Sequence, residues 1–165
     1  LASDVAPDVR SRSYRIVAEV EIPDGGATGV LIAHGDATSG YTLYVDDGHL
    51  VHDLNVGGTH HVVRSDRPVE PGRHDLGFRM ERIDGVGTGT LSVDGVDVGS
   101  METEHFFFTL ISFSGLDIGL DRGSPVGHYA APNRFTGTLR RVVVDMDHDQ
   151  EVDHDAAGDV QAARD

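Results

Sequence analysis

The chain has 165 residues, 38% of them hydrophobic, and its formal net charge is −15 at pH 7. This length suits one domain, which would hide about two-thirds of the surface of the unfolded chain. The acidic balance disfavours binding to nucleic acids or anionic membranes, and the absence of cysteine excludes disulfides and thiolate chemistry.

Alternating apolar and polar residues begin at Tyr14. From Tyr14 to Ile22 the even positions are apolar, whereas Arg15, Glu19 and Glu21 stand at odd positions. A period of two is typical of an antiparallel strand with one buried and one solvated face. We therefore predict a strand here, with the two glutamates on its solvated face rather than acting as a catalytic pair.

The same pattern returns along the chain, separated by glycine-rich turns. The pairs Asp47-Gly48 and Asp94-Gly95 are typical of tight hairpin turns. No segment keeps a helical repeat over three turns, so we predict an all-β fold of about ten strands. The further segments predicted as strands are 29–34, 40–45, 49–54, 60–64, 73–80, the hairpin 90–98, 105–112, 116–118 and 135–144.

The number of strands and a long crossover at residues 121–133 favour a two-sheet antiparallel jelly-roll sandwich, as in concanavalin A-like and laminin G-like domains. We expect residues 1–12 to be a leader or linker, residues 13–146 to form the sandwich, and the acidic residues 147–165 to be a disordered tail. The chain begins at Leu1 without a signal-peptide pattern, so we expect it to derive from a longer protein. No apolar run reaches the roughly 20 residues of a membrane-spanning helix.

Several short segments, taken in chain order, resemble the C-terminal β-sandwich domain of bacterial arylsulfatases of the formylglycine type. The most distinctive is Asp-Arg-Gly-Ser-Pro-Val at 121–126, which precedes the closing strand at 134–146. Residues 16–23, 71–74 and 89–95 resemble an opening strand, a turn and a hairpin in the same order. The resemblance covers nearly the whole of the predicted sandwich.

This resemblance implies an accessory role rather than a catalytic one. Members of the family hydrolyse sulfate esters with a formylglycine hydrate and a divalent cation, and the nucleophile comes from a Cys/Ser-x-Pro-x-Arg motif. This chain has no cysteine, and none of its six prolines follows a serine by two positions. The implied function is an accessory domain that packs beside the sulfatase catalytic domain of a parent enzyme and shapes the rim of its cleft.

The loop 121–132 is the predicted contact with that catalytic domain, because loops held on a rigid scaffold often carry specific contacts. Arg122, Ser124 and Tyr129 are the candidate contact residues. On this hypothesis, replacing Tyr129 by Ala leaves the stability of the isolated domain nearly unchanged and weakens its docking.

Acidic residues beside this loop are candidates for a structural Ca²⁺ site. Asp117 and Asp121 flank the start of the loop, with Asp36 as a third candidate, and Ca²⁺ takes carboxylates and backbone carbonyls as ligands. The alternative is that these carboxylates cap turns by accepting backbone hydrogen bonds. The ten histidines show no converging set of three or four ligands, so a histidine metal site is not predicted.

Two other functions stay open at the level of sequence. A jelly roll can be a carbohydrate-binding module, although aromatic residues make up only 6% of the chain and tryptophan is absent. A hydrolase in its own right is disfavoured, because the closest match to a catalytic pair, Glu19 and Glu21, lies on a solvated strand face without a third acid. Gly-Val-Gly-Thr-Gly at 85–89 is interpreted as a flexible turn, and one ring of the run 106–108 is expected to face away from the core.

Overall fold

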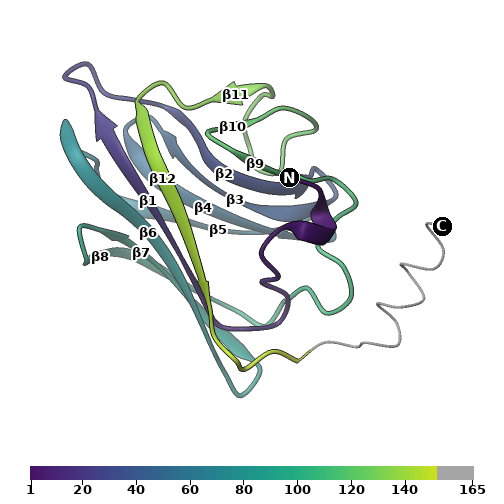
Figure 1. Cartoon of the computed structure of the whole chain (residues 1–165). Helices are drawn as coiled ribbons and strands as arrows, with labels where there is room; N and C mark the ends of the chain where they lie inside the picture. Colours follow the sequence, from purple (N-terminus) through teal and green to yellow (C-terminus); the bar gives the residue numbers. More distant parts are fainter. Residues whose placement is uncertain (152–165) are drawn as a thin grey trace.

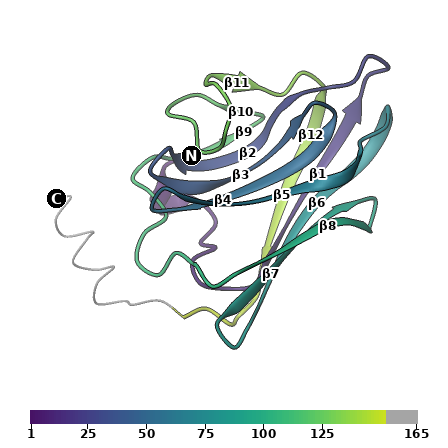
Figure 2. The same ribbon diagram turned by 180° about the vertical axis from the view of Figure 1, so that it is seen from behind.

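Strand β1 (Tyr14–Ile22) shows the predicted alternation: Ile16 and Ala18 are fully buried, whereas Arg15 is exposed. It pairs with β6 on one side and with β12 on the other, antiparallel in both cases. The computed structural model describes residues 1–151 and places β1 within one of two sheets that face each other (Figures 1 and 2).

The sheet that contains β1, here called sheet I, has five strands in the order β12, β1, β6, β7, β8. Two of its hairpins turn through Asp84 and Asp94, whose φ angles are 51° and 52°. Aspartate tolerates this left-handed conformation better than most residues, because its short side chain bonds to nearby backbone. The bounds of the other strands are β6 (Gly72–Ile83), β7 (Val86–Val93), β8 (Val96–Thr103) and β12 (Thr138–Met146).

The opposing sheet, sheet II, has seven strands. Strands β2 to β5 form an antiparallel meander, and three short strands extend it on the side of β2. The long strands are β2 (Gly29–Asp36), β3 (Ser39–Asp46), β4 (His49–Val56) and β5 (Thr59–Pro68). The short ones are β9 (Leu116–Ile118), β10 (Leu120–Asp121) and β11 (Asn133–Arg134).

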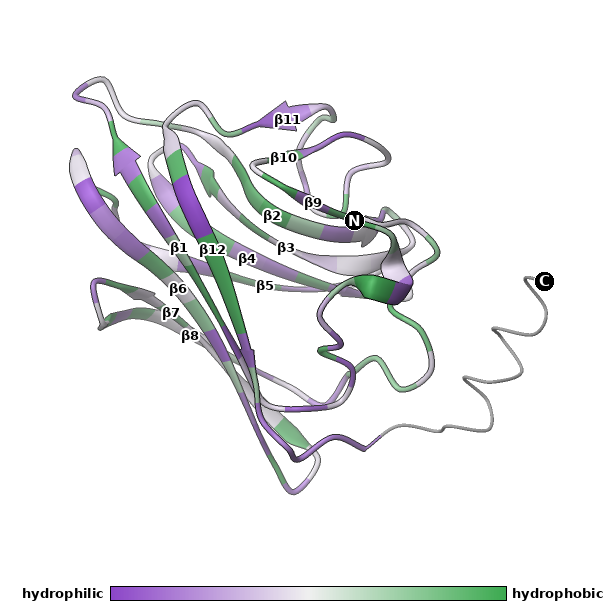
Figure 3. Ribbon diagram, in the orientation of Figure 1, coloured by the Kyte–Doolittle hydropathy of each residue, from purple (hydrophilic) through white to green (hydrophobic). Residues whose placement is uncertain are grey.

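The core lies between the two sheets. Phe78 and Leu91 of sheet I and Tyr41 and Leu43 of sheet II are each 1% exposed or less. Figure 3 shows the alternation of hydrophobic and hydrophilic residues along β1 that gives the sheet one apolar face. Burying this apolar surface contributes about 25 cal/mol per Å² and is the main force that holds the sheets together. The architecture confirms the predicted jelly-roll sandwich.

The glycine-rich segment 85–89 lies mostly in β7, so its interpretation as a flexible turn is wrong beyond Gly85. A Cβ atom at Gly89 would stand 2.8 Å from the Phe78 ring, and one at Gly87 would stand 2.7 Å from the Met80 sulfur. Interiors are close-packed, so these two glycines leave space for larger core side chains.

The predicted strand at 105–112 is also wrong. Residues 104–115 form a crossover loop from β8 to β9, in which Phe106, Phe107 and Ile111 are buried and Phe108 is 46% exposed. Phe106 and Phe107 are consecutive, and a strand would point them to opposite faces. In a loop both rings can point into the core. Phe108 points outward, which agrees with the expectation that one ring of the run 106–108 faces away from the core.

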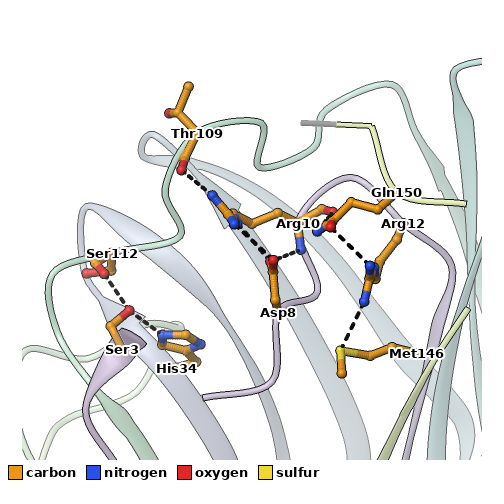
Figure 4. A network of polar contacts seen from close by, with 9 residues as sticks. All are labelled: Ser3, Asp8, Arg10, Arg12, His34, Thr109, Ser112, Met146 and Gln150. Atoms are coloured by element: carbon orange, nitrogen blue, oxygen red, sulfur yellow. Dashed lines mark hydrogen bonds and ion pairs between the residues drawn. The ribbon is translucent and has the colours of Figure 1, made fainter. Parts of the chain in front are cut away.

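The N-terminal segment 1–12 packs against the sandwich, unlike the leader or linker that the sequence predicts. Val9 is 3% exposed and belongs to the core cluster. Ser3 Oγ lies 2.9 Å from His34 Nε2, and Arg10 donates to a backbone carbonyl of the crossover loop (Figure 4). An apolar anchor and buried polar partners therefore order a segment whose polar composition resembles a linker.

The start of the acidic tail is also attached to the sandwich. Asp149 accepts hydrogen bonds from the backbone nitrogen (2.8 Å) and Oγ (2.5 Å) of Ser13, and Glu151 pairs with Arg82. The rest of the predicted disordered tail, residues 152–165, lies outside the described residues. Among residues 1–151, no helix combines the length and apolar character needed to cross a membrane.

Candidate functional site

The loop 121–132 lies on the outer face of sheet II, opposite the face that packs in the core. Val126 is fully buried there against Val30, Tyr44 and Val51, in an apolar cluster separate from the main core. These sheet residues alternate along β2 to β4 with side chains that face sheet I. The loop therefore gives this part of sheet II a second buried face.

Asp121 holds the loop in place. Its side chain is 3% exposed and accepts hydrogen bonds from the backbone nitrogen of Val126 (3.1 Å) and from the Tyr129 hydroxyl (2.7 Å). The Tyr129 ring packs edge-on against Tyr44, with ring centroids 4.9 Å apart, and burial raises the pKa of its hydroxyl. These contacts reverse the expectation that replacing Tyr129 by Ala leaves the stability nearly unchanged.

The other two candidate contact residues, Arg122 and Ser124, are exposed. Arg122 pairs with Asp117 at 2.6 Å, and Ser124 Oγ accepts a hydrogen bond from the backbone nitrogen of Ala37 (3.2 Å). Contact of this surface with a sulfatase catalytic domain stays a prediction.

The three carboxylates considered for Ca²⁺ all have partners within the chain. Arg122 donates to Asp117 from its side chain and backbone, which lowers the pKa of that carboxyl although burial alone would raise it. Asp36 accepts hydrogen bonds from the hydroxyl groups of Thr38 and Ser112. These bonds match the alternative of turn and loop capping. A Ca²⁺ site at Asp117 and Asp121 stays a prediction that requires the bonds to be replaced.

Sequence reasoning missed a cluster on the outer face of sheet II, formed by Asp53 of β4, His60 of β5 and His128 of the loop. One ligand atom from each residue lies within 4.8 Å of those of the other two. His60 Nδ1 is 2.7 Å from Asp53 Oδ2, and the rings of His60 and His128 have centroids 4.2 Å apart. Burial raises the pKa of the Asp53 carboxyl, and the contact with His60 acts in the opposite direction.

The sequence predicts that two of the three residues, Asp53 and His60, lie close together. A hairpin turning at Gly57-Gly58 brings Asp53 and His60 onto neighbouring strands, which correspond to the predicted strands 49–54 and 60–64. His128 joins them because the loop 121–132 folds onto sheet II, and the spacing of residues in the sequence does not predict this packing.

A second candidate site lies on the outer face of sheet I, where three shallow hollows follow β1 and β6. The middle hollow has a volume of about 280 Å³ and shares Arg15 and Arg79 with a neighbour of about 480 Å³. It shares Asp75 with the third, of about 460 Å³. The three adjoining hollows are here called the sheet I furrow. The residues that line its middle part are Arg15, Val17, Asp75, Gly77, Arg79, Ser92 and Gly95.

Two arginines face each other in this furrow, because Arg15 and Arg79 are direct cross-strand partners. Arg79 is neutralised by a two-pronged contact with Asp97 (2.8 and 2.9 Å) and by Glu81 (2.9 Å). The exposed Arg15 side chain makes no hydrogen bond or ion pair with any residue from 1 to 151. Like charges directly opposite each other are unfavourable. On its other side Arg15 lies opposite Asp145 of β12, with which it forms no ion pair, so the furrow holds a cation that is not paired with any residue from 1 to 151.

The sheets and their order define the class of this protein as a jelly-roll β-sandwich. No protein-family profile matches the chain. No curated protein matches it either. Among solved structures, domains LG4-5 of the mouse laminin α1 chain match with a TM-score of 0.63 and 18% identity, covering 93% of this chain and 41% of that one.

Two further structures show the same fold. The CBM40 module of Ruminococcus gnavus IT-sialidase, solved with α2,3-sialyllactose bound, has a TM-score of 0.58 and 15% identity over 92% of this chain and 83% of that one. The native heptameric SAP-like pentraxin of Limulus polyphemus has a TM-score of 0.52 and 16% identity, covering 92% and 76%. These likenesses confirm the predicted laminin G-like architecture. They give no support to an arylsulfatase origin, which stays a prediction.

Proposed function

We propose that this chain is a non-catalytic carbohydrate-binding module and that the sheet I furrow holds the sugar. The fold is shared with a CBM40 module that binds sialyllactose, which supports the alternative function considered from the sequence more than the sulfatase accessory role. Fold alone does not carry function, so the proposal depends on the chemistry of the furrow.

The observation that carries the proposal is a row of adjoining polar hollows on the outer face of sheet I. Sugar hydroxyl groups both donate and accept hydrogen bonds, and the furrow offers both kinds of partner. Arg15 and Arg79 are donors, Asp75 is an acceptor, and Ser92 is both. Gly77 has no side chain to occupy the middle of the furrow. A Cβ atom at this position would stand 2.5 Å from Ser92 Oγ.

The uncommitted Arg15 favours a sugar that carries a carboxylate. A guanidinium and a carboxylate form two parallel hydrogen bonds, which fix orientation as well as affinity. The net charge of −15 opposes anionic ligands at long range. Charges beyond about 8 Å are screened at physiological salt, so the balance between Arg15 and the nearby carboxylates Asp75 and Asp145 decides.

The predicted accessory role uses a different face of the molecule. Its candidate contacts, Arg122, Ser124 and Tyr129, lie with the loop on sheet II, whereas the furrow lies on sheet I. Sugar binding in the furrow therefore neither requires nor excludes a neighbouring catalytic domain.

Isothermal titration of the 165-residue chain with α2,3-sialyllactose and with lactose tests the proposal. We expect sialyllactose to bind more tightly than lactose. Arg15→Ala should weaken sialyllactose binding about tenfold or more, because a hydrogen bond to a charged group contributes about 1.5–3 kcal/mol.

Arg67→Ala is the matched control, because Arg67 is an exposed arginine on sheet II that pairs with its neighbour Asp66. The control should bind like the unchanged chain. The proposal is wrong if neither sugar binds, or if the two arginine variants lose the same affinity.

A further inference from the structure

We infer that Asp53, His60 and His128 bind one divalent transition-metal ion of the zinc class, which fastens the loop 121–132 to sheet II. The three residues come from two neighbouring strands and from the loop that crosses them. The inference goes beyond sugar binding and concerns the opposite face of the sandwich.

The three side chains are already close to the geometry of a metal site. Bonds from zinc to nitrogen or oxygen are about 2.0–2.2 Å, so ligands of a tetrahedral ion stand roughly 3.4 Å apart. The ligand atoms here lie within 4.8 Å of one another, before any ion draws them together. His128 is exposed, so rotation of its ring can close the remaining distance.

A second observation, at Asp53, favours a cation at this site independently of the distances. Its side chain is 0% exposed, and Oδ1 has no hydrogen-bond partner among the described residues. A buried carboxylate oxygen without a partner is costly, and a bound cation removes that cost. The hydrogen of His60 can move from Nδ1 to Nε2, which frees Nδ1 as a ligand while Asp53 stays beside it.

One buried amide fixes the backbone on both sides of the cluster. Asn55 is 0% exposed, and its Nδ2 donates to the carbonyl oxygen of Val126, two residues before His128. Its Oδ1 accepts from the backbone nitrogen of Gly58, two residues before His60. The positions of the two histidine backbones are therefore coupled through Asn55.

Asp121 adds a second anchor to the loop, because it binds Val126 and Tyr129 on either side of His128. Sites held by supporting hydrogen bonds lose less entropy when they bind a ligand. The loop therefore presents His128 to the sheet before any ion arrives.

The ligand types select the class of metal. Two imidazoles and one carboxylate suit Zn²⁺, Ni²⁺, Cu²⁺ or Co²⁺, whereas Ca²⁺ and Mg²⁺ prefer oxygen ligands alone. Three protein ligands leave one position of a tetrahedral ion open, and the exposed His128 places that position toward solvent.

Titration with ZnCl₂ alone tests the inference, by calorimetry and by thermal melting of the whole chain. His148 and His154 are replaced by Ala in every protein, because Asp-His-Asp sequences in the tail can bind metal weakly. We expect one Zn²⁺ per chain and a melting temperature that rises with Zn²⁺, since the ion binds only the folded state.

His128→Ala should weaken Zn²⁺ binding at least about tenfold and abolish the rise in melting temperature. His128 is exposed, so its replacement should leave the fold intact, and it is preferred to a change at the buried Asp53. His105→Ala is the control, because His105 is an exposed histidine outside the cluster that pairs with another histidine, His61, at 2.9 Å. The inference is overturned if Zn²⁺ does not bind, or if His105→Ala weakens binding while His128→Ala does not.

Discussion

His52 makes the stability of this fold sensitive to acid. The side chain is fully buried in the core, and its ring stacks on Phe78 with centroids 3.5 Å apart and planes within 3° of parallel. Neither ring nitrogen has a hydrogen-bond partner among the described residues. Burial therefore lowers the pKa of His52 from 6.5 to about 3. The folded state holds this imidazole neutral at pH values where the unfolded state protonates it.

The sign and size of the effect follow from this lowered pKa. Between pH 6.5 and pH 3 the unfolded state binds one more proton at this position, so stability is lost as the pH falls. The loss is about 1.4 kcal/mol per pH unit and reaches about 2 kcal/mol at pH 5. His52→Phe keeps an aromatic ring on Phe78 and removes the titrating group.

Urea unfolding at pH 7 and at pH 5 measures this contribution. Between these two pH values, the unchanged chain should lose about 2 kcal/mol more than His52→Phe. Burial also lowers the pKa of His34 to about 4, but His34 and the carboxylates are present in both proteins, so their effects cancel. Equal losses in His52→Phe and the unchanged chain would refute the reasoning.

Three further changes test other parts of the structure. Tyr129→Phe should lower the free energy of unfolding by about 1–3 kcal/mol, because it leaves the buried Asp121 without its hydroxyl donor; an unchanged urea midpoint would contradict this. Gly89→Ala should destabilise by about 1–3 kcal/mol, because the new methyl group meets the Phe78 ring; an unchanged melting temperature would show that the core has spare room. Millimolar Ca²⁺ should raise the melting temperature if the predicted site exists, and Asp117→Asn should abolish the rise; no rise in the unchanged chain would exclude that site.

Most strands were predictable, both where one face is buried, as in β1, and where two are, as in β2 to β4. The alternation at 14–22 gave β1 with its observed bounds, and the Asp-Gly pairs placed two hairpin turns. The prediction of a strand at 105–112 was wrong. The consecutive phenylalanines have the aromatic composition typical of strands, but they lack the alternation of apolar and polar residues. Residues 1–12 also differ from the expected leader, because Val9 lies in the core and Ser3 and Arg10 bond to other parts of the chain.

The candidate sites depend on pairings between distant parts of the chain. The opposition of Arg15 and Arg79 follows from the register of β1 against β6, and the sequence does not fix that register to the residue. His128 joins Asp53 and His60 only because Asn55 and Asp121 hold the loop down. Residue types and local spacing predict secondary structure, whereas sites of this kind depend on how distant parts of the chain come together in the fold.

NMR spectroscopy of the ¹⁵N-labelled chain during titration with α2,3-sialyllactose tests the proposed function most directly. We expect saturable changes in the amide signals of furrow residues such as Arg15, Gly77 and Ser92, and none at Val126 on the opposite face. The absence of changes with this sugar, or changes centred on the loop 121–132, would contradict sugar binding in the sheet I furrow.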